Sequence, residues 1–249
     1  MMPEKQVAEL LQRLQSSAGE HVQSVVLYGS AASPEFHADV SDVNILLVLH
    51  EASVTALHCL GPVVKWWVKQ KHPAPMLFSR AELEKSADIF AIEMLDIQKG
   101  HRVLLGEDIF ARLHIPMALH HVQVEHELRS KLLLLRQHYV TIEEDHPRVL
   151  RLMLKSVSTF LTLFRHALLA LDEAAALPAG WRETIDGVER RMMVDVSAFK
   201  ELLDVREKKT SAASLAVHQV FARYQAAIEQ VSARVDESLA QGPARQRKS

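Results

Sequence analysis

The chain has very little of the residues that cross-link or interrupt a polypeptide. It contains one cysteine, Cys59, with 8 glycines and 9 prolines among 249 residues. A single cysteine excludes an internal disulfide, and the N-terminus lacks the basic-then-apolar order of a secretion signal. Scarce glycine and proline favour long helices. We therefore expect a helix-rich protein of the cytoplasm.

The chain also lacks a strong net charge and a long uninterrupted apolar run. Its formal charge is -2 and its pI is about 6.7, so it has no overall basic surface, and we expect no nucleic-acid partner. The most apolar helical stretch, residues 149–171, is interrupted by Arg151, Lys155 and Arg165. These charges would be energetically costly inside a membrane, so we expect a buried bundle helix and no membrane partner.

The residues that are present predict an α+β protein with a mixed sheet in its N-terminal half. Hydrophobic residues make up 48% of the chain, enough for a substantial core. Apolar spacing and turn residues predict helices at 4–17, 54–68 and 79–86, and strands at 24–28, 43–49, 76–78 and 89–97. We expect the strands at 24–28 and 43–49 to be adjacent.

The C-terminal half has the spacing of a helical bundle. Helix-period segments cover residues 117–141, 147–172, 180–206 and 212–239, which predicts four helices. We place a first domain with the mixed sheet at 1–112 and a helical bundle domain at 113–240. Residues 241–249, with three basic side chains, are predicted to be a disordered tail.

The stretch that indicates a ligand site is Leu27-Tyr28-Gly29-Ser30, followed by Ser41-Asp42-Val43-Asn44. Alternate residues of a strand share a face, so Asp42 and Asn44 should project together beside the Gly29-Ser30 turn. Gly29 would let the backbone approach a ligand closely, and the Ser30 hydroxyl could hold phosphate oxygens. Asp42 could hold a Mg²⁺ ion that bridges those oxygens.

These residues resemble the DNA polymerase β-like nucleotidyltransferase superfamily, whose motif is Gly-Ser, a short spacer, a small residue, Asp, an apolar residue and Asp. The match consists of Gly29, Ser30, Ser41, Asp42 and Val43. Relatives similar to kanamycin nucleotidyltransferase follow the catalytic domain with a helical one. The resemblance implies Mg²⁺-dependent transfer of a nucleoside monophosphate from a nucleoside triphosphate to a hydroxyl of a small molecule or a protein.

The resemblance also implies a set of site residues, with one departure. Asp42 and Asn44 would hold the metal, and Gly29, Ser30 and Ser41 the nucleotide. Asn44 replaces the second carboxylate of the family, and its amide oxygen can bind a hard cation but brings no charge. The third carboxylate, a general base on a later strand, matches Glu93 better than Asp96; strand alternation would place these two on opposite faces.

Three interpretations of this stretch remain open. The chain is a working nucleotidyltransferase, or a catalytically degenerate nucleotide-binding or partner-binding module, as Asn44 suggests. In the third, Gly29-Ser30 is only a tight turn and Ser41-Asp42 only a cap in a structural protein. Self-association into a homo-oligomer is left open as well.

Overall fold

The computed structural model describes residues 4–32, 43–172 and 176–245, and it leaves the side chains of Ser30 and residues 239–245 undescribed. The chain divides into two compact units, Met1–Met117 and Ala118–Ser249. The first unit contains a sheet covered by helices on both faces, and the second is entirely helical in its described part. The α+β fold class is thereby confirmed.

The first unit is built around a four-stranded mixed sheet of order β3-β2-β1-β4. Its elements are α1 (Glu4–Ala18), β1 (Val22–Tyr28), the short 3-10 helix η1 (Gly29–Ala32), β2 (Asn44–Leu49), α2 (Val54–Lys69), β3 (Met76–Ser79), α3 (Arg80–Lys85), α4 (Ala91–Lys99) and β4 (His101–Gly106). Strand β1 is antiparallel to β2 and to β4, whereas β2 and β3 are parallel. The predicted neighbours β1 and β2 do lie side by side.

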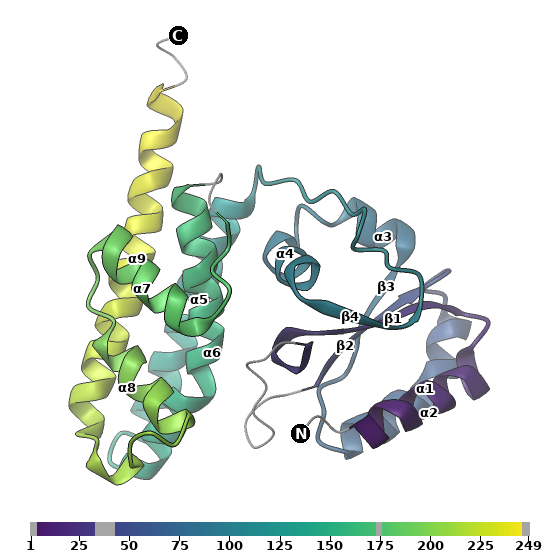
Figure 1. Ribbon diagram of the computed structural model, residues 1–249, viewed down its shortest axis with the longest axis horizontal. Coiled ribbons are helices and arrows are strands. Elements are labelled where there is room, and N and C mark those ends of the chain that lie inside the picture. Colours follow the sequence, from purple (N-terminus) through teal and green to yellow (C-terminus); the bar gives the residue numbers. More distant parts are fainter. Residues whose placement is uncertain (1–3, 33–42, 173–175, 246–249) are drawn as a thin grey trace. The chain divides into compact units, whose positions relative to one another are not determined.

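Two apolar clusters pack on opposite faces of this sheet, beneath the helices that cover each face (Figure 1). Val25, Leu27, Ile45 and Leu47 pack against α1 and α2. The alternate residues Val26, Leu46 and Val48 pack against α3 and α4. Helices cover both faces, which is why β1 and β2 are almost continuously apolar.

The prediction of a strand at 89–97 is wrong, because this segment contains helix α4. Its local composition is rich in apolar residues, but Ala91, Met94 and Ile97 recur at the helical spacing and are all buried in one cluster. The last strand instead follows as β4, where Val103-Leu104-Leu105 ends at Gly106. Periodicity within a short apolar run could not separate these two alternatives.

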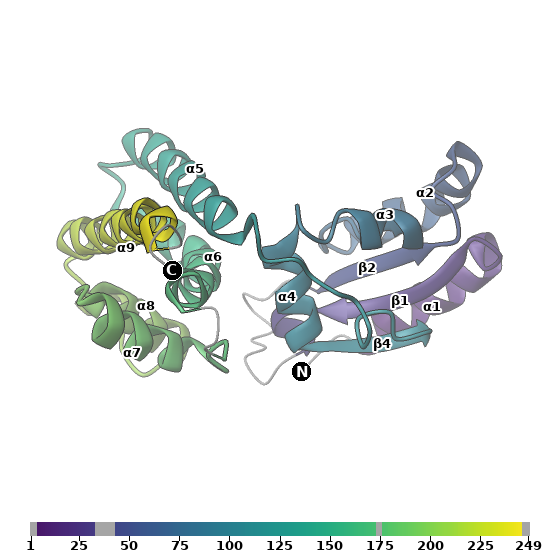
Figure 2. The same cartoon turned by 90° about the horizontal axis from the view of Figure 1, so that it is seen from above.

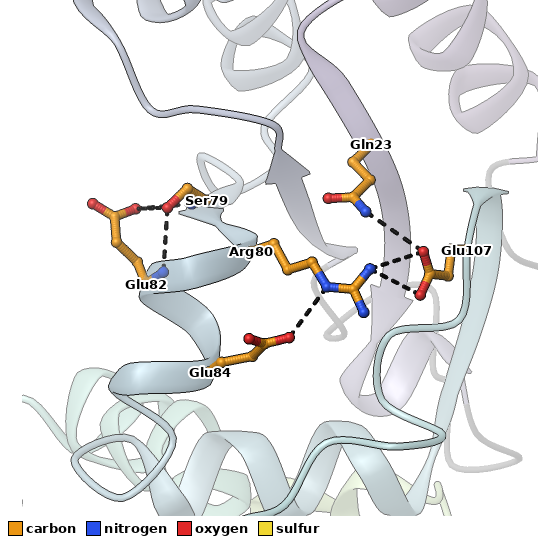
Figure 3. Close-up of polar contacts among 6 residues, drawn as sticks. All are labelled: Gln23, Ser79, Arg80, Glu82, Glu84 and Glu107. Atoms are coloured by element: carbon orange, nitrogen blue, oxygen red, sulfur yellow. Dashed lines mark hydrogen bonds and ion pairs between the residues drawn. The ribbon is translucent and has the colours of Figure 1, made fainter.

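An ion-pair network joins α3 to the end of β4 across one end of the sheet (Figure 3). Arg80 Nη1 lies 3.0 and 2.9 Å from the two carboxylate oxygens of Glu107, and Arg80 Nε lies 3.1 Å from Glu84 Oε1. Ser79 and Glu82 form a capping box at the start of α3, as the serine predicts. These contacts fix α3 on the sheet, on the same face as α4.

The second unit has five α-helices in its described part, not the predicted four. They are α5 (His120–Val140), α6 (His146–Leu171), α7 (Trp181–Met192), α8 (Ser197–Arg206) and α9 (Val217–Arg245), with a 3-10 turn η2 (Ala212–Ser214) (Figure 2). The segment 180–206 is divided because Met193 takes a left-handed backbone conformation, with φ +56°. Helix α9 includes residues 241–245 of the predicted disordered tail; residues 246–249 lie outside the described residues.

Helix α6 is the core of the second unit, which confirms the prediction of a buried bundle helix. Among the described residues it is the one helix long and apolar enough to span a membrane, and 61% of the relevant window is buried within the protein. Val157, Phe160 and Phe164 are completely or almost completely buried. Its apolar character is therefore explained by packing against its neighbouring helices.

Candidate nucleotide site

Gly29 occupies the end of β1, where the backbone turns sharply into η1. Its φ is +72°, a conformation that residues with a Cβ adopt only at a cost. A Cβ built on Gly29 would lie 2.9 Å from Nδ2 of Asn44. Glycine is therefore required here for the turn and for the close approach of the Asn44 side chain.

Asn44 opens β2 directly opposite Tyr28 of β1 in the antiparallel register. Leu46 and Val48 face α3 and α4, so strand alternation places Asn44 on this same face. Tyr28 also packs against the cluster on that face. The structure thus brings Asn44, Tyr28 and Gly29 together at one end of the sheet.

The other residues of the predicted motif are described only in part. Ser41 and Asp42 lie outside the described residues, and of Ser30 only the backbone is described, within η1. Val43, immediately before β2, is buried. Their roles stay predictions that follow from the motif.

Glu93 lies in the first turn of α4, where it is exposed, and not on a strand. Burial, and secondarily the negative charge of Glu93, raise the pKa of Tyr28 to about 12. The carboxylate of Glu93 is therefore close enough to act electrostatically on the Tyr28 hydroxyl. In a helix, Glu93 and Asp96 are neighbours at a spacing of three, so the expectation that they face opposite sides is wrong.

Neither of the later strands carries an acidic residue: β3 is Met-Leu-Phe-Ser and β4 is His-Arg-Val-Leu-Leu-Gly. Met76 pairs with Leu46 and belongs to the cluster on the α4 face, as does Phe78. The positions of β3 that share a face with Asn44 are therefore apolar. A carboxylate can reach this face from α4, through Glu93, but not from β3 or β4.

His101 is a residue of this region that the sequence did not single out. It pairs with Tyr28 on the side away from Asn44, so Asn44, Tyr28 and His101 form a row across three strands. Its Nδ1 lies 2.8 Å from the Ile97 carbonyl and its Nε2 lies 3.0 Å from Asp108 Oδ1. No sequence motif links His101 to Asp108, and only the pairing of β4 with β1 reveals the row.

Asp108 holds His101 in place and also accepts a hydrogen bond from the Ala111 backbone at 3.1 Å. Burial raises the pKa of Asp108, but the hydrogen bonds from His101 and the backbone outweigh it and leave the pKa below its usual value. Both ring nitrogens of His101 are thus engaged within the protein.

A magnesium ion at this end of the sheet would find few charged ligands. Within the described residues, no group of three His, Cys, Asp or Glu side chains is placed to hold a metal. The Asn44 carboxamide forms no hydrogen bond to any described residue, and its oxygen is a suitable neutral ligand for a hard cation. Asn44 therefore fits Mg²⁺ as a ligand, with less charge than a carboxylate would bring.

A mixed sheet covered by helices and followed by a helical unit is the fold of the DNA polymerase β-like nucleotidyltransferases. The chain has this fold. A solved structure that it resembles is spectinomycin adenyltransferase AAD(9) from Enterococcus faecialis, crystallised with ATP and spectinomycin.

The comparison with spectinomycin adenyltransferase AAD(9) concerns the fold alone. The TM-score is 0.53 at 11% sequence identity, and the alignment covers 94% of this chain and 99% of the other. No protein-family model and no curated protein sequence matches the chain. The resemblance seen in the short sequence motif is thus confirmed at the level of the fold.

Proposed function

We propose that this protein binds a nucleoside triphosphate at the Gly29 turn and transfers the nucleoside monophosphate to a hydroxyl of a small molecule or a protein. The observation that carries the proposal is the meeting of Gly29 and Asn44 at one end of the sheet, with Glu93 within electrostatic range of the adjacent Tyr28. The neighbour crystallised with ATP and spectinomycin supports ATP as donor and a small molecule as acceptor.

Each residue has a distinct task in the proposed reaction. Gly29, Ser30 and Ser41 hold phosphate oxygens. Glu93 takes the proton from the acceptor hydroxyl, whose oxygen attacks the α-phosphorus while the bond to pyrophosphate breaks.

Metal binding in this proposal depends on Asp42 and on the amide oxygen of Asn44. Mg²⁺ held there would neutralise the charge that develops on the phosphate oxygens. With an amide in place of a carboxylate, the chain offers a weaker metal site than the two-carboxylate arrangement of the family.

Transfer is tested by the release of pyrophosphate from ATP in the presence of Mg²⁺. The acceptors are spectinomycin and the protein itself. We expect Asp42→Ala and Glu93→Gln to abolish release, whereas Asp96→Asn, the matched change one helical turn away, should leave it intact. Asn44→Asp should raise the rate by restoring the negative charge that the amide ligand lacks. Unchanged release in Asp42→Ala would show that the site is wrong.

A second candidate function is a nucleotide-binding or partner-binding module without transfer. The observation that favours it is the acid-free sequence of β3 and β4 beside Asn44. In this case the protein would bind nucleotide, as measured by calorimetry, and release no pyrophosphate with any acceptor. Absence of binding for ATP, GTP, CTP and UTP, with and without Mg²⁺, would refute both candidate functions and leave a structural protein.

A further inference from the structure

Two polar side chains at the glycine turn have no hydrogen-bond partner among the described residues. They are the Tyr28 hydroxyl and the Asn44 carboxamide, and both residues are half-buried. A partly buried polar group that makes no hydrogen bond is unfavourable unless water or a ligand satisfies it. By contrast, Ser24 and Gln98 of the same unit donate hydrogen bonds to backbone carbonyls.

The two groups are neighbours on the same face of the sheet. Tyr28 and Asn44 are directly paired across β1 and β2, which places their Cβ atoms about 4.5–5.5 Å apart. The Asn44 amide nitrogen is directed at Gly29, where the missing side chain leaves the backbone accessible. Both polar groups can therefore reach one ligand beside the turn.

The chemistry of the pair is that of neutral hydrogen-bond donors. A tyrosine hydroxyl is protonated throughout the physiological range, so that of Tyr28 can donate a hydrogen bond. The Asn44 amide nitrogen carries two N–H groups. Such donors suit the oxygens of a phosphate, whereas a metal ion would require oxygen acceptors or anions.

The electrostatics of the surroundings agree with an anion held by neutral donors. On β3, the positions of this face are the apolar Met76 and Phe78. His101, on the other side of Tyr28, is bonded to Asp108. Glu93 is exposed, so solvent screens its repulsion of a bound phosphate.

We propose that Tyr28 and Asn44 bind a phosphate group of the nucleotide directly, so that nucleotide binding does not depend on a divalent metal. This inference rests on the proposed nucleotide site and deepens it: Tyr28 becomes a binding residue, and Asn44 determines whether the free or the metal-bound nucleotide is accepted. The amide oxygen of Asn44 stays available as a metal ligand for the transfer step. Replacement of the family's carboxylate thereby removes a repulsion from phosphate as well as one negative charge from the metal site.

Calorimetry with ATP as the probe tests this, once in excess Mg²⁺ and once in EDTA, on the full chain. We expect the wild type to bind ATP in EDTA within about threefold of its affinity in Mg²⁺. Tyr28→Phe keeps the ring packing and removes one hydrogen bond to a charged group, so its affinity should fall roughly tenfold under both conditions. Tyr139→Phe removes a hydroxyl that bonds His218 in the helical unit, and it should bind as the wild type does.

Asn44→Asp is the decisive variant, because it is isosteric and replaces a donor by an anion. Its affinity in EDTA should fall at least tenfold, and Mg²⁺ should restore binding. Binding by the wild type that requires Mg²⁺ and is unaffected by Tyr28→Phe would overturn this inference while leaving the proposed function intact. No binding under either condition by a folded wild type, checked by circular dichroism, would overturn both.

Discussion

Replacement of Gly29 by alanine should damage both the stability of the protein and its nucleotide site. The left-handed conformation at φ +72° costs an alanine about 1–2 kcal/mol. The new Cβ would also meet Asn44 Nδ2 at 2.9 Å, so the amide must move. We expect Gly29→Ala to lower the free energy of unfolding by about 1–2 kcal/mol and to weaken ATP binding roughly tenfold.

Two other glycines provide matched controls for this prediction. Gly106 has φ +81°, and a Cβ there would collide with the carbonyl oxygen of Gln23, at the end of β1 that is remote from Gly29. Gly106→Ala should therefore destabilise the protein more than Gly29→Ala does, yet leave the affinity of the folded protein for ATP unchanged. Gly61 lies inside α2 with open space at its Cβ position, so Gly61→Ala should stabilise the protein by about 0.5–1 kcal/mol.

Urea unfolding of the three variants gives the stabilities, and calorimetry with ATP gives the affinities. The reasoning is refuted if Gly29→Ala is as stable as the wild type. It is equally refuted if Gly29→Ala and Gly106→Ala lose the same affinity, because the loss would then reflect strain in the sheet and not contact with the ligand.

Three further predictions concern the stability of the two units, each measured by urea unfolding. Ser79→Ala removes the capping box with Glu82 and should cost about 1 kcal/mol. The pKa of Asp108 is lowered in the folded protein, so its pairing with His101 stabilises the fold when the pH is above the ordinary carboxyl pKa. This stabilisation is lost as the pH falls through the pKa of Asp108 in the folded protein. The stability difference between the wild type and Asp108→Asn should therefore shrink on acidification, and a constant difference would contradict the assignment. Phe164→Ala should cost about 3–5 kcal/mol, because this ring is completely buried in α6.

Much of the fold was accessible from local sequence signals. The apolar strands beginning at Val22 and Asn44 were recognised because both their faces are buried. The Ser79 cap marked the start of α3, and the scarcity of glycine and proline indicated the helical unit. These signals act within a few residues, so they do not need the rest of the chain.

Glu93 shows where local reasoning was insufficient. The apolar residues of segment 89–97 are compatible with a strand or with a buried helix. The segment forms a helix because Ala91 and Met94 then both pack against the sheet. Pairing of β4 with β1 likewise decides that His101 lies beside Tyr28. The left-handed Met193 that divides α7 from α8 carries no glycine or proline signal at all.

The sequence by itself determined the fold class and the glycine turn with Asn44 beside it, because strand alternation and backbone sterics are local properties. Only the tertiary structure decided that Tyr28 faces Asn44, that Glu93 approaches from a helix, and that β3 brings no carboxylate to this face. Those facts depend on which strands pair and which helix covers them. Pairing and coverage are set by burial of the whole apolar surface, which no single segment encodes.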